Sequence, residues 1–131
     1  MLDARTWIHA KLTNHVGVQS VLGSRIFSAL GIDPGSTPDE KPFAVIRLGN
    51  VPRAMPEGGT TIDATIWVHG EPVGYTDIDE AIEQIKLALE GPITSEPDGI
   101  QADWTGDSAD LQDDARQTNV RTTSFRLAAR R

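Results

Sequence analysis

Hydrophobic and polar residues alternate most regularly between Thr60 and His69. From residue 62 to residue 68 the even positions carry isoleucine, alanine or valine, whereas the odd positions of the stretch carry threonine, aspartate, tryptophan or histidine. A period of two is typical of a strand with one buried face. We therefore predict a half-buried strand over residues 60–69, with Trp67 on the face opposite the isoleucines.

Two other stretches have the spacing of amphipathic helices. Between Thr76 and Leu89, isoleucines and a leucine recur at helical intervals, and the Gly-Pro pair that follows Glu90 ends the predicted helix. An apolar stripe from Ala4 to Leu12 predicts a first helix over residues 4–14, after which Asn14-His15 and a short apolar turn follow.

Shorter apolar or β-branched runs between turn-rich segments predict the remaining strands. These cover residues 25–30, 42–48, 99–105 and 119–129. Trp104 alternates with Ile100 and is predicted to lie in the core. The apolar residues of the last run do not keep one parity, which predicts a β-bulge or a strand covered by a neighbouring subunit. The polar, acidic residues 106–118 are predicted to form a loop.

The order of elements predicts the fold class. Successive strands are joined by connections too short for parallel crossovers, so they should pair in antiparallel fashion. We predict an α+β fold, a mainly antiparallel four- to five-stranded sheet with two helices packed on it. Residues 1–131 are expected to form a single domain, in which residues 119–131 are a terminal strand with a basic end.

Charge is distributed unevenly along the 131 residues, whose formal net charge is −7. Residues 57–114 hold 15 acidic residues and one base, Lys86, whereas residues 115–131 hold five arginines and no acid. Such an acidic chain is poorly suited to coating nucleic acid through phosphate contacts. Separated charges of opposite sign do suit association between copies, although a solvated acidic surface is the alternative interpretation.

Candidate chemistry is sparse. The chain has no cysteine, which excludes disulfides and thiolate metal sites, and it has no phosphate-binding loop, serine elbow or zinc-protease motif. Asp77 and Asp79 are explained by the positive end of a helix dipole. We expect no catalytic, cofactor-binding or metal-ligating residue. No apolar run approaches the roughly 18 residues of a transmembrane helix, so no membrane partner is expected.

Three residues are candidates for contact with another chain. Trp67 is a large aromatic side chain on the face of its strand opposite the isoleucines, although the second helix covering that face would be the alternative. Arg53 and Met55 stand in a loop, residues 49–59, where apolar side chains occur among turn residues. The alternative for that loop is a mobile hairpin tip.

Several short stretches resemble a known family in their order and spacing. They are VLGSRIF at 21–27, KPFAVI at 41–46, WVH at 67–69, GY at 74–75, LEG at 89–91, Asp113-Asp114, and FRL at 125–127. Together they resemble the tail-terminator (tail-completion) family of long-tailed bacteriophages over nearly the whole chain. An acidic insert around residues 106–114 and a longer loop at 31–41 depart from the family pattern.

The resemblance implies a non-enzymatic structural protein of the virion, assembled in the host cytoplasm. Members form a hexameric ring that caps the head-proximal end of the tail tube, stops tube polymerisation and joins the tail to the head connector or stopper. The implied partners are therefore further copies of the chain, the tail-tube protein and the head-side protein. Viral DNA passes through the ring without sequence-specific binding.

The charged segments fit such a ring in two ways. An acidic lumen would repel DNA phosphates and let the duplex slide, and the candidate acids are Asp107, Asp110, Asp113 and Asp114. A closed ring also needs two different patches that match each other. The candidate arginines for such a patch, expected to meet acids of a neighbouring subunit or partner ring, are Arg121, Arg126, Arg130 and Arg131.

Two other functions remain open from the sequence. The chain could be another head–tail neck component, an adaptor or stopper, or a tube-like minor tail protein, because related folds recur among these proteins. A less favoured alternative is a small α+β ligand-binding or enzymatic domain near Trp67 and His69. It predicts a pocket with convergent polar groups and a histidine of shifted pKa.

Overall fold

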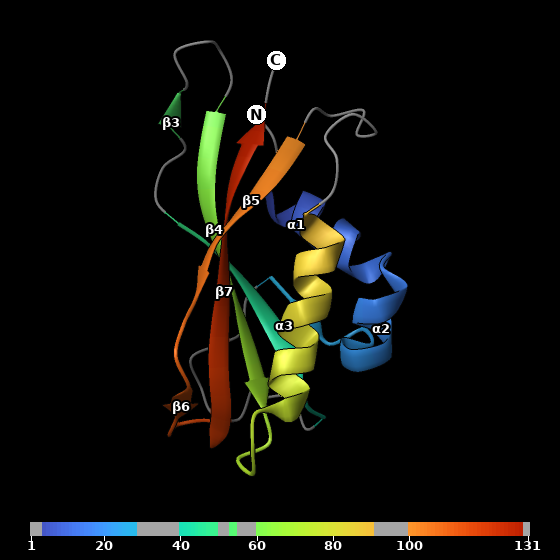
Figure 1. Ribbon diagram of the computed structural model, residues 1–131, viewed down its shortest axis with the longest axis vertical. Coiled ribbons are helices and arrows are strands. Elements are labelled where there is room, and N and C mark those ends of the chain that lie inside the picture. Colours follow the sequence, from blue (N-terminus) through green and yellow to red (C-terminus); the bar gives the residue numbers. More distant parts are fainter. Residues whose placement is uncertain (1–3, 29–39, 50–52, 55–59, 91–99, 130–131) are drawn as a thin grey trace.

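The computed structural model describes residues 4–28, 40–49, 53–54, 60–90 and 100–129. In these residues the helices lie together on one face of a long sheet (Figure 1). The helices are α1 (Ala4–Thr13), α2 (Val16–Leu22) and α3 (Thr76–Leu89). The strands are β1 (Ile26–Phe27), β2 (Phe43–Leu48), β3 (Arg53–Ala54), β4 (Thr60–Gly70), β5 (Ile100–Asp107), β6 (Leu111–Asp113) and β7 (Thr118–Ala129).

The sheet is built on its two longest strands, β4 and β7. They pair in antiparallel fashion from Thr60 opposite Ala129 to Gly70 opposite Asn119. The strand order is β1-β2-β4-β7-β5, with β3 also paired to β4 and β6 also paired to β7. β1 runs parallel to β2, and the other pairs are antiparallel. The predicted α+β class is confirmed, and the sheet of the described residues is mixed.

The prediction undercounted the elements. The described residues form three helices and seven strands, where two helices and four to five strands were expected. The extra helix, α2, begins after His15, whose Nδ1 atom accepts a hydrogen bond from the Val18 backbone N–H at 3.2 Å. A side chain that satisfies an orphan N–H in the first turn stabilises a helix start. The apolar turn expected after residue 14 is therefore helical.

The polar loop predicted over residues 106–118 also needs correction, because parts of this segment form strands. β5 extends to Asp107, and β6 pairs with β7 through Leu111 opposite Val120. Ser108 continues the pairing, because its backbone N–H donates to Thr122 O and its hydroxyl accepts from Thr122 N, both at 2.9 Å. Pairing with a long neighbouring strand thus orders residues whose own strand propensity is low.

The core lies between the helices and the sheet. The alternation predicted for β4 is confirmed, because Ala64, Ile66 and Val68 are each at most 1% exposed. The stripe of α3 is confirmed as well, with its isoleucines and Leu89 buried against the sheet. Gly70, at the end of β4, allows this packing, since a Cβ there would lie 2.7 Å from Ile78 Cγ1. A larger residue would push β4 and α3 apart.

The mixed parity of β7 has a different cause from the two that were expected. Phe125 and Leu127 point into the helix-side core, whereas Val120 is buried on the opposite face beside its register partner His69. The first half of β7 is therefore buried on both faces. The irregularity of register lies in β5, between Trp104 and Gly106.

Candidate assembly interface

The face of the sheet opposite the helices carries the first group of candidate residues. Trp67 lies there on β4, half-buried, with the Arg47 guanidinium of β2 5.6 Å from its ring centroid. Further along the same face, Arg126 Nε donates to Asp63 Oδ1 at 3.1 Å, and both side chains are about half exposed. The exposed part of this face is thus a row of aromatic, polar and paired charged groups. Such pairs add little stability.

At the Gly70 end of β4, the same face of the sheet is buried around His69. Its ring stacks on Phe43 with centroids 4.7 Å apart, and its Nδ1 lies 2.8 Å from Thr118 Oγ1. Burial lowers the pKa of His69 to about 4, and nearby Asp113 only partly offsets this effect. His69 is therefore neutral at pH 7. Burial, with smaller contributions from the positive charges of Arg116 and Arg47, accounts for the lowered pKa without a ligand.

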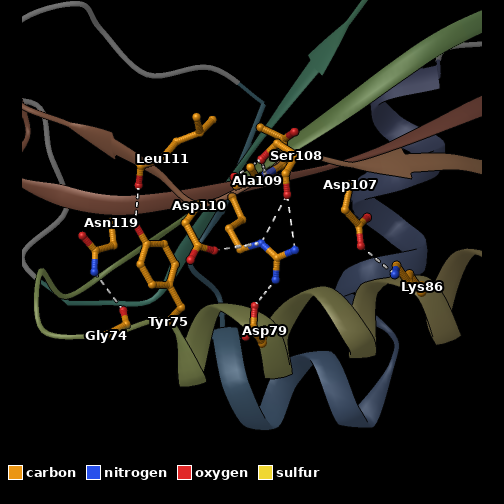
Figure 2. A network of polar contacts seen from close by, with 12 residues as sticks. Gly74, Tyr75, Asp79, Lys86, Asp107, Ser108, Ala109, Asp110, Leu111 and Asn119 are labelled. Atoms are coloured by element: carbon orange, nitrogen blue, oxygen red, sulfur yellow. Dashed lines mark hydrogen bonds and ion pairs between the residues drawn. The ribbon is translucent and has the colours of Figure 1, made fainter.

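A network of polar contacts joins β7 to α3 and to the segment between β5 and β6. The Arg121 guanidinium of β7 contacts Asp79 on α3, lies 3.5 Å from Asp110, and donates to the Ser108 carbonyl. Figure 2 shows Asp79, Asp110 and Ser108 converging on one point between the helix and the sheet. The hydrogen bond with Asp79 raises the pKa of Arg121 above its ordinary value.

Two further hydrogen bonds extend this network. Towards the start of α3, the Tyr75 hydroxyl donates to Leu111 O at 2.8 Å, and Asn119 Nδ2 donates to Gly74 O at 3.0 Å (Figure 2). Arg121 and Tyr75 thus fasten the acidic segment between β5 and β7 to α3 and its first turn, and Asn119 fastens β7 to the turn before α3. The polar groups of this segment therefore help to hold the segment in place within its own subunit.

Three of the four candidate lumen acids are engaged by basic side chains of the same chain. Asp107 Oδ2 lies 2.7 Å from Lys86 Nζ, Asp110 pairs with Arg121, and Asp113 pairs with Arg116 at 3.8 Å. Burial would raise the pKa of Asp107, but hydrogen bonds from Lys86 and Trp104 outweigh it and lower the pKa. Asp114 is exposed. This surface is accordingly less negative than the sequence suggests.

The remaining candidate contact residues, the arginines and Met55, fall into three groups. Arg121 and Arg126 bind acids of their own chain, so reversing the charge of Arg121 would disturb the monomer itself. Arg130, Arg131 and Met55 lie outside the described residues. For Arg53 the structure gives the backbone, which pairs in β3 with Thr61 of β4. That these residues contribute to contacts between subunits stays a prediction.

Trp104 was predicted to be a core residue, and this is wrong. Its side chain is 45% exposed, although the strand pairs it with buried Phe125. Lys86 Nζ lies 4.4 Å from its ring centroid, and its Nε1–H donates to Asp107 Oδ1 at 2.8 Å. The alternation with Ile100 gave the correct face, but β5 is the edge strand, where the sheet ends and cover is incomplete.

The described residues contain no group of three or more metal-ligating side chains. A surface hollow does lie beside His69's partner Thr118, and its lining also includes Asp113, Asp114, Gln117 and Asn119. The Thr118 hydroxyl is already bonded to His69. None of the helices in the described part of the chain is long and apolar enough to cross a membrane.

Comparison with known proteins supports the fold. No protein-family model matches the chain, and no curated protein sequence matches it significantly. Among solved structures, one match is a chain of the "Virion of native gene transfer agent (GTA) particle", with a TM-score of 0.75 and 12% sequence identity. The match covers 96% of this chain and 93% of that one. The chain therefore shares its fold with a chain of a gene transfer agent virion.

Proposed function

We propose that the chain is a structural component of a phage-like particle and acts as a tail terminator. The observation that carries this proposal is the fold it shares, over nearly the full length of both chains, with a chain of a gene transfer agent virion. The order of short stretches along the sequence, which resembles the tail-terminator family, narrows the role within the particle.

In this role, copies of the chain form a hexameric ring at the head-proximal end of the tail tube. One surface of the ring stops tube polymerisation, and the other joins the connector or stopper of the head. DNA crosses the ring without sequence-specific contacts. Exposed acids such as Asp114 would keep phosphates from adhering to the lumen, since like charges repel a sliding duplex.

Other neck and tail proteins are the alternatives that need to be separated by experiment. Adaptors, stoppers and tube proteins recur with related folds, so the fold does not distinguish them. Their assembly behaviour does, because a tube protein polymerises into extended tubes whereas a terminator forms one ring or caps a tube end.

The test is negative-stain electron microscopy of the purified chain at several protein and salt concentrations, together with mass measurement in solution. Single six-fold rings with a central hole are expected. The chain is then added to its cognate tail-tube protein, and tube length and end structure are compared with tube protein alone.

Short, capped tubes would support the terminator role. Extended tubes of the chain by itself would identify a tube protein instead. Absence of rings at every salt concentration, combined with tubes that stay uncapped, would overturn the proposal.

A further inference from the structure

Opposite edges of the sheet carry opposite charge. The strand order places β1 and β2 at one edge and β5 with β6 at the other. On the first side, residues 4–28 and 40–49 hold five basic residues and one acidic residue. On the second side, residues 100–117, which include β5 and β6, hold five acidic residues and one basic residue. One subunit therefore presents two edges that are complementary to each other.

The basic edge comprises α1, β1 and β2. Arg5 of α1 donates to the carbonyls of Ser28 at 2.6 Å and Ile46 at 3.1 Å, which places a cation along the free side of β2. Arg47, the second-to-last residue of β2, is exposed, and its guanidinium lies over the ring of Trp67. These groups extend the positive charge from the helix to the open face of the sheet.

The acidic edge has an aromatic side chain held in a fixed orientation. Trp104 keeps 45% of its surface exposed while Asp107 accepts from its indole N–H and Lys86 lies over its ring. Asp103, its neighbour in β5, is exposed as well. A large aromatic group that is already ordered loses little conformational entropy on binding, and such residues often dominate interfaces.

We propose that the β5 edge, centred on Trp104 and Asp103, docks against the basic β1–β2 edge around Arg47 of the next copy. This inference rests on the proposed ring and identifies the two surfaces that close it. A ring is built from heterologous contacts, in which each subunit uses two different patches once. Two edges on opposite sides of one sheet, with complementary charge, meet that requirement.

A charge-reversal pair tests the inference. Arg47→Glu alters the basic edge alone, and Asp103→Lys alters the acidic edge alone. Each variant by itself should need about tenfold or more protein for half-maximal ring formation, because like charges then face each other. In an equimolar mixture, each altered edge can meet its altered complement. Rings containing both variants should therefore return, as measured by mass and electron microscopy.

Trp104→Ala tests the aromatic part of the contact. It should raise the concentration needed for rings by about tenfold or more, as expected for a central aromatic anchor. Val73→Ala is the control, since Val73 is 90% exposed in the turn between β4 and α3, outside β1, β2 and β5. Circular dichroism and urea unfolding confirm that each variant is folded. If rings form only on the tube, capping of tubes is the readout for all variants.

The outcomes separate this inference from the function on which it rests. Wild-type protein that neither forms rings nor caps tubes overturns both. Wild-type rings accompanied by unchanged assembly of Arg47→Glu, Asp103→Lys and Trp104→Ala overturn the edge contact and leave the terminator role standing. Loss of assembly in both charge variants without recovery in the mixture also contradicts contact between the two edges.

Discussion

At the scale of single residues, burial explains the lowered pKa of His69. It lies at the end of β4, 5% exposed, stacked on Phe43 and bonded to Thr118. The sequence placed it correctly on the face opposite the isoleucines. It did not reveal the burial, because Phe43 and Thr118 are distant in sequence and meet His69 only when β2 and β7 pair with β4.

The lowered pKa of His69 predicts a dependence of stability on pH. Below about pH 6.5 the unfolded chain gains a proton on this ring, whereas the native ring does so only near pH 4. The contribution to the free energy of unfolding is therefore complete above pH 6.5. It is lost as the pH falls towards 4, by roughly 3 kcal/mol at most.

We expect His69→Gln to be less stable than wild type at pH 7 but to lose less stability between pH 7 and 4.5. Urea unfolding at four pH values in this range measures both slopes. His9→Gln, which removes a half-buried histidine from α1, is the control. Parallel slopes for wild type and His69→Gln would show that His69 is not held neutral by the fold.

At the scale of elements, Arg121 connects three of them. It contacts Asp79 on α3 and Asp110 and Ser108 between β5 and β6, while it belongs to β7. The sequence suggested a contact between subunits for this arginine, because a closed ring needs two matching patches and the chain has an acidic middle and an arginine-rich end. Strand pairing brings the partners together, and spacing along the sequence gives no sign of it.

Arg121→Gln should lower the free energy of unfolding by about 1–2 kcal/mol, because it removes several charge-assisted hydrogen bonds from a partly buried group. Arg126→Gln is the matched control on the same strand. Its partner Asp63 is 53% exposed, so the loss should stay below about 0.5 kcal/mol. Urea unfolding compares the two, and equal losses would mean that the network around Arg121 adds nothing to stability.

At the scale of the whole molecule, the separation of charge between the two edges is the main feature. The sequence shows the same imbalance between its segments, but it suggested the arginine-rich end as the basic patch. In the structure the basic edge is N-terminal, and the described arginines of β7 bind acids of their own chain. Which charges share an edge depends on strand order, which does not follow chain order.

Assembly through these edges should weaken as salt is added. Raising the ionic strength from about 0.1 M to about 1 M shortens the screening length from roughly 10 Å to roughly 3 Å. The apparent dissociation constant of the ring should rise by about tenfold or more, while the urea midpoint of the monomer changes little. Analytical ultracentrifugation measures the first quantity. Rings that become tighter with salt would indicate a mainly apolar contact instead.

Helices and strands whose hydrophobic pattern repeats every few residues could be predicted from the sequence alone. The alternation of β4 and the stripe of α3 follow from the local geometry of strand and helix, and they led to the α+β class. The strand character of residues 106–107 and 111–113, the exposure of Trp104 and the partners of Arg121 depended on the long strand β7 and on the position of β5 at an edge. These properties arise from contacts between distant segments, which residue type and local spacing do not encode.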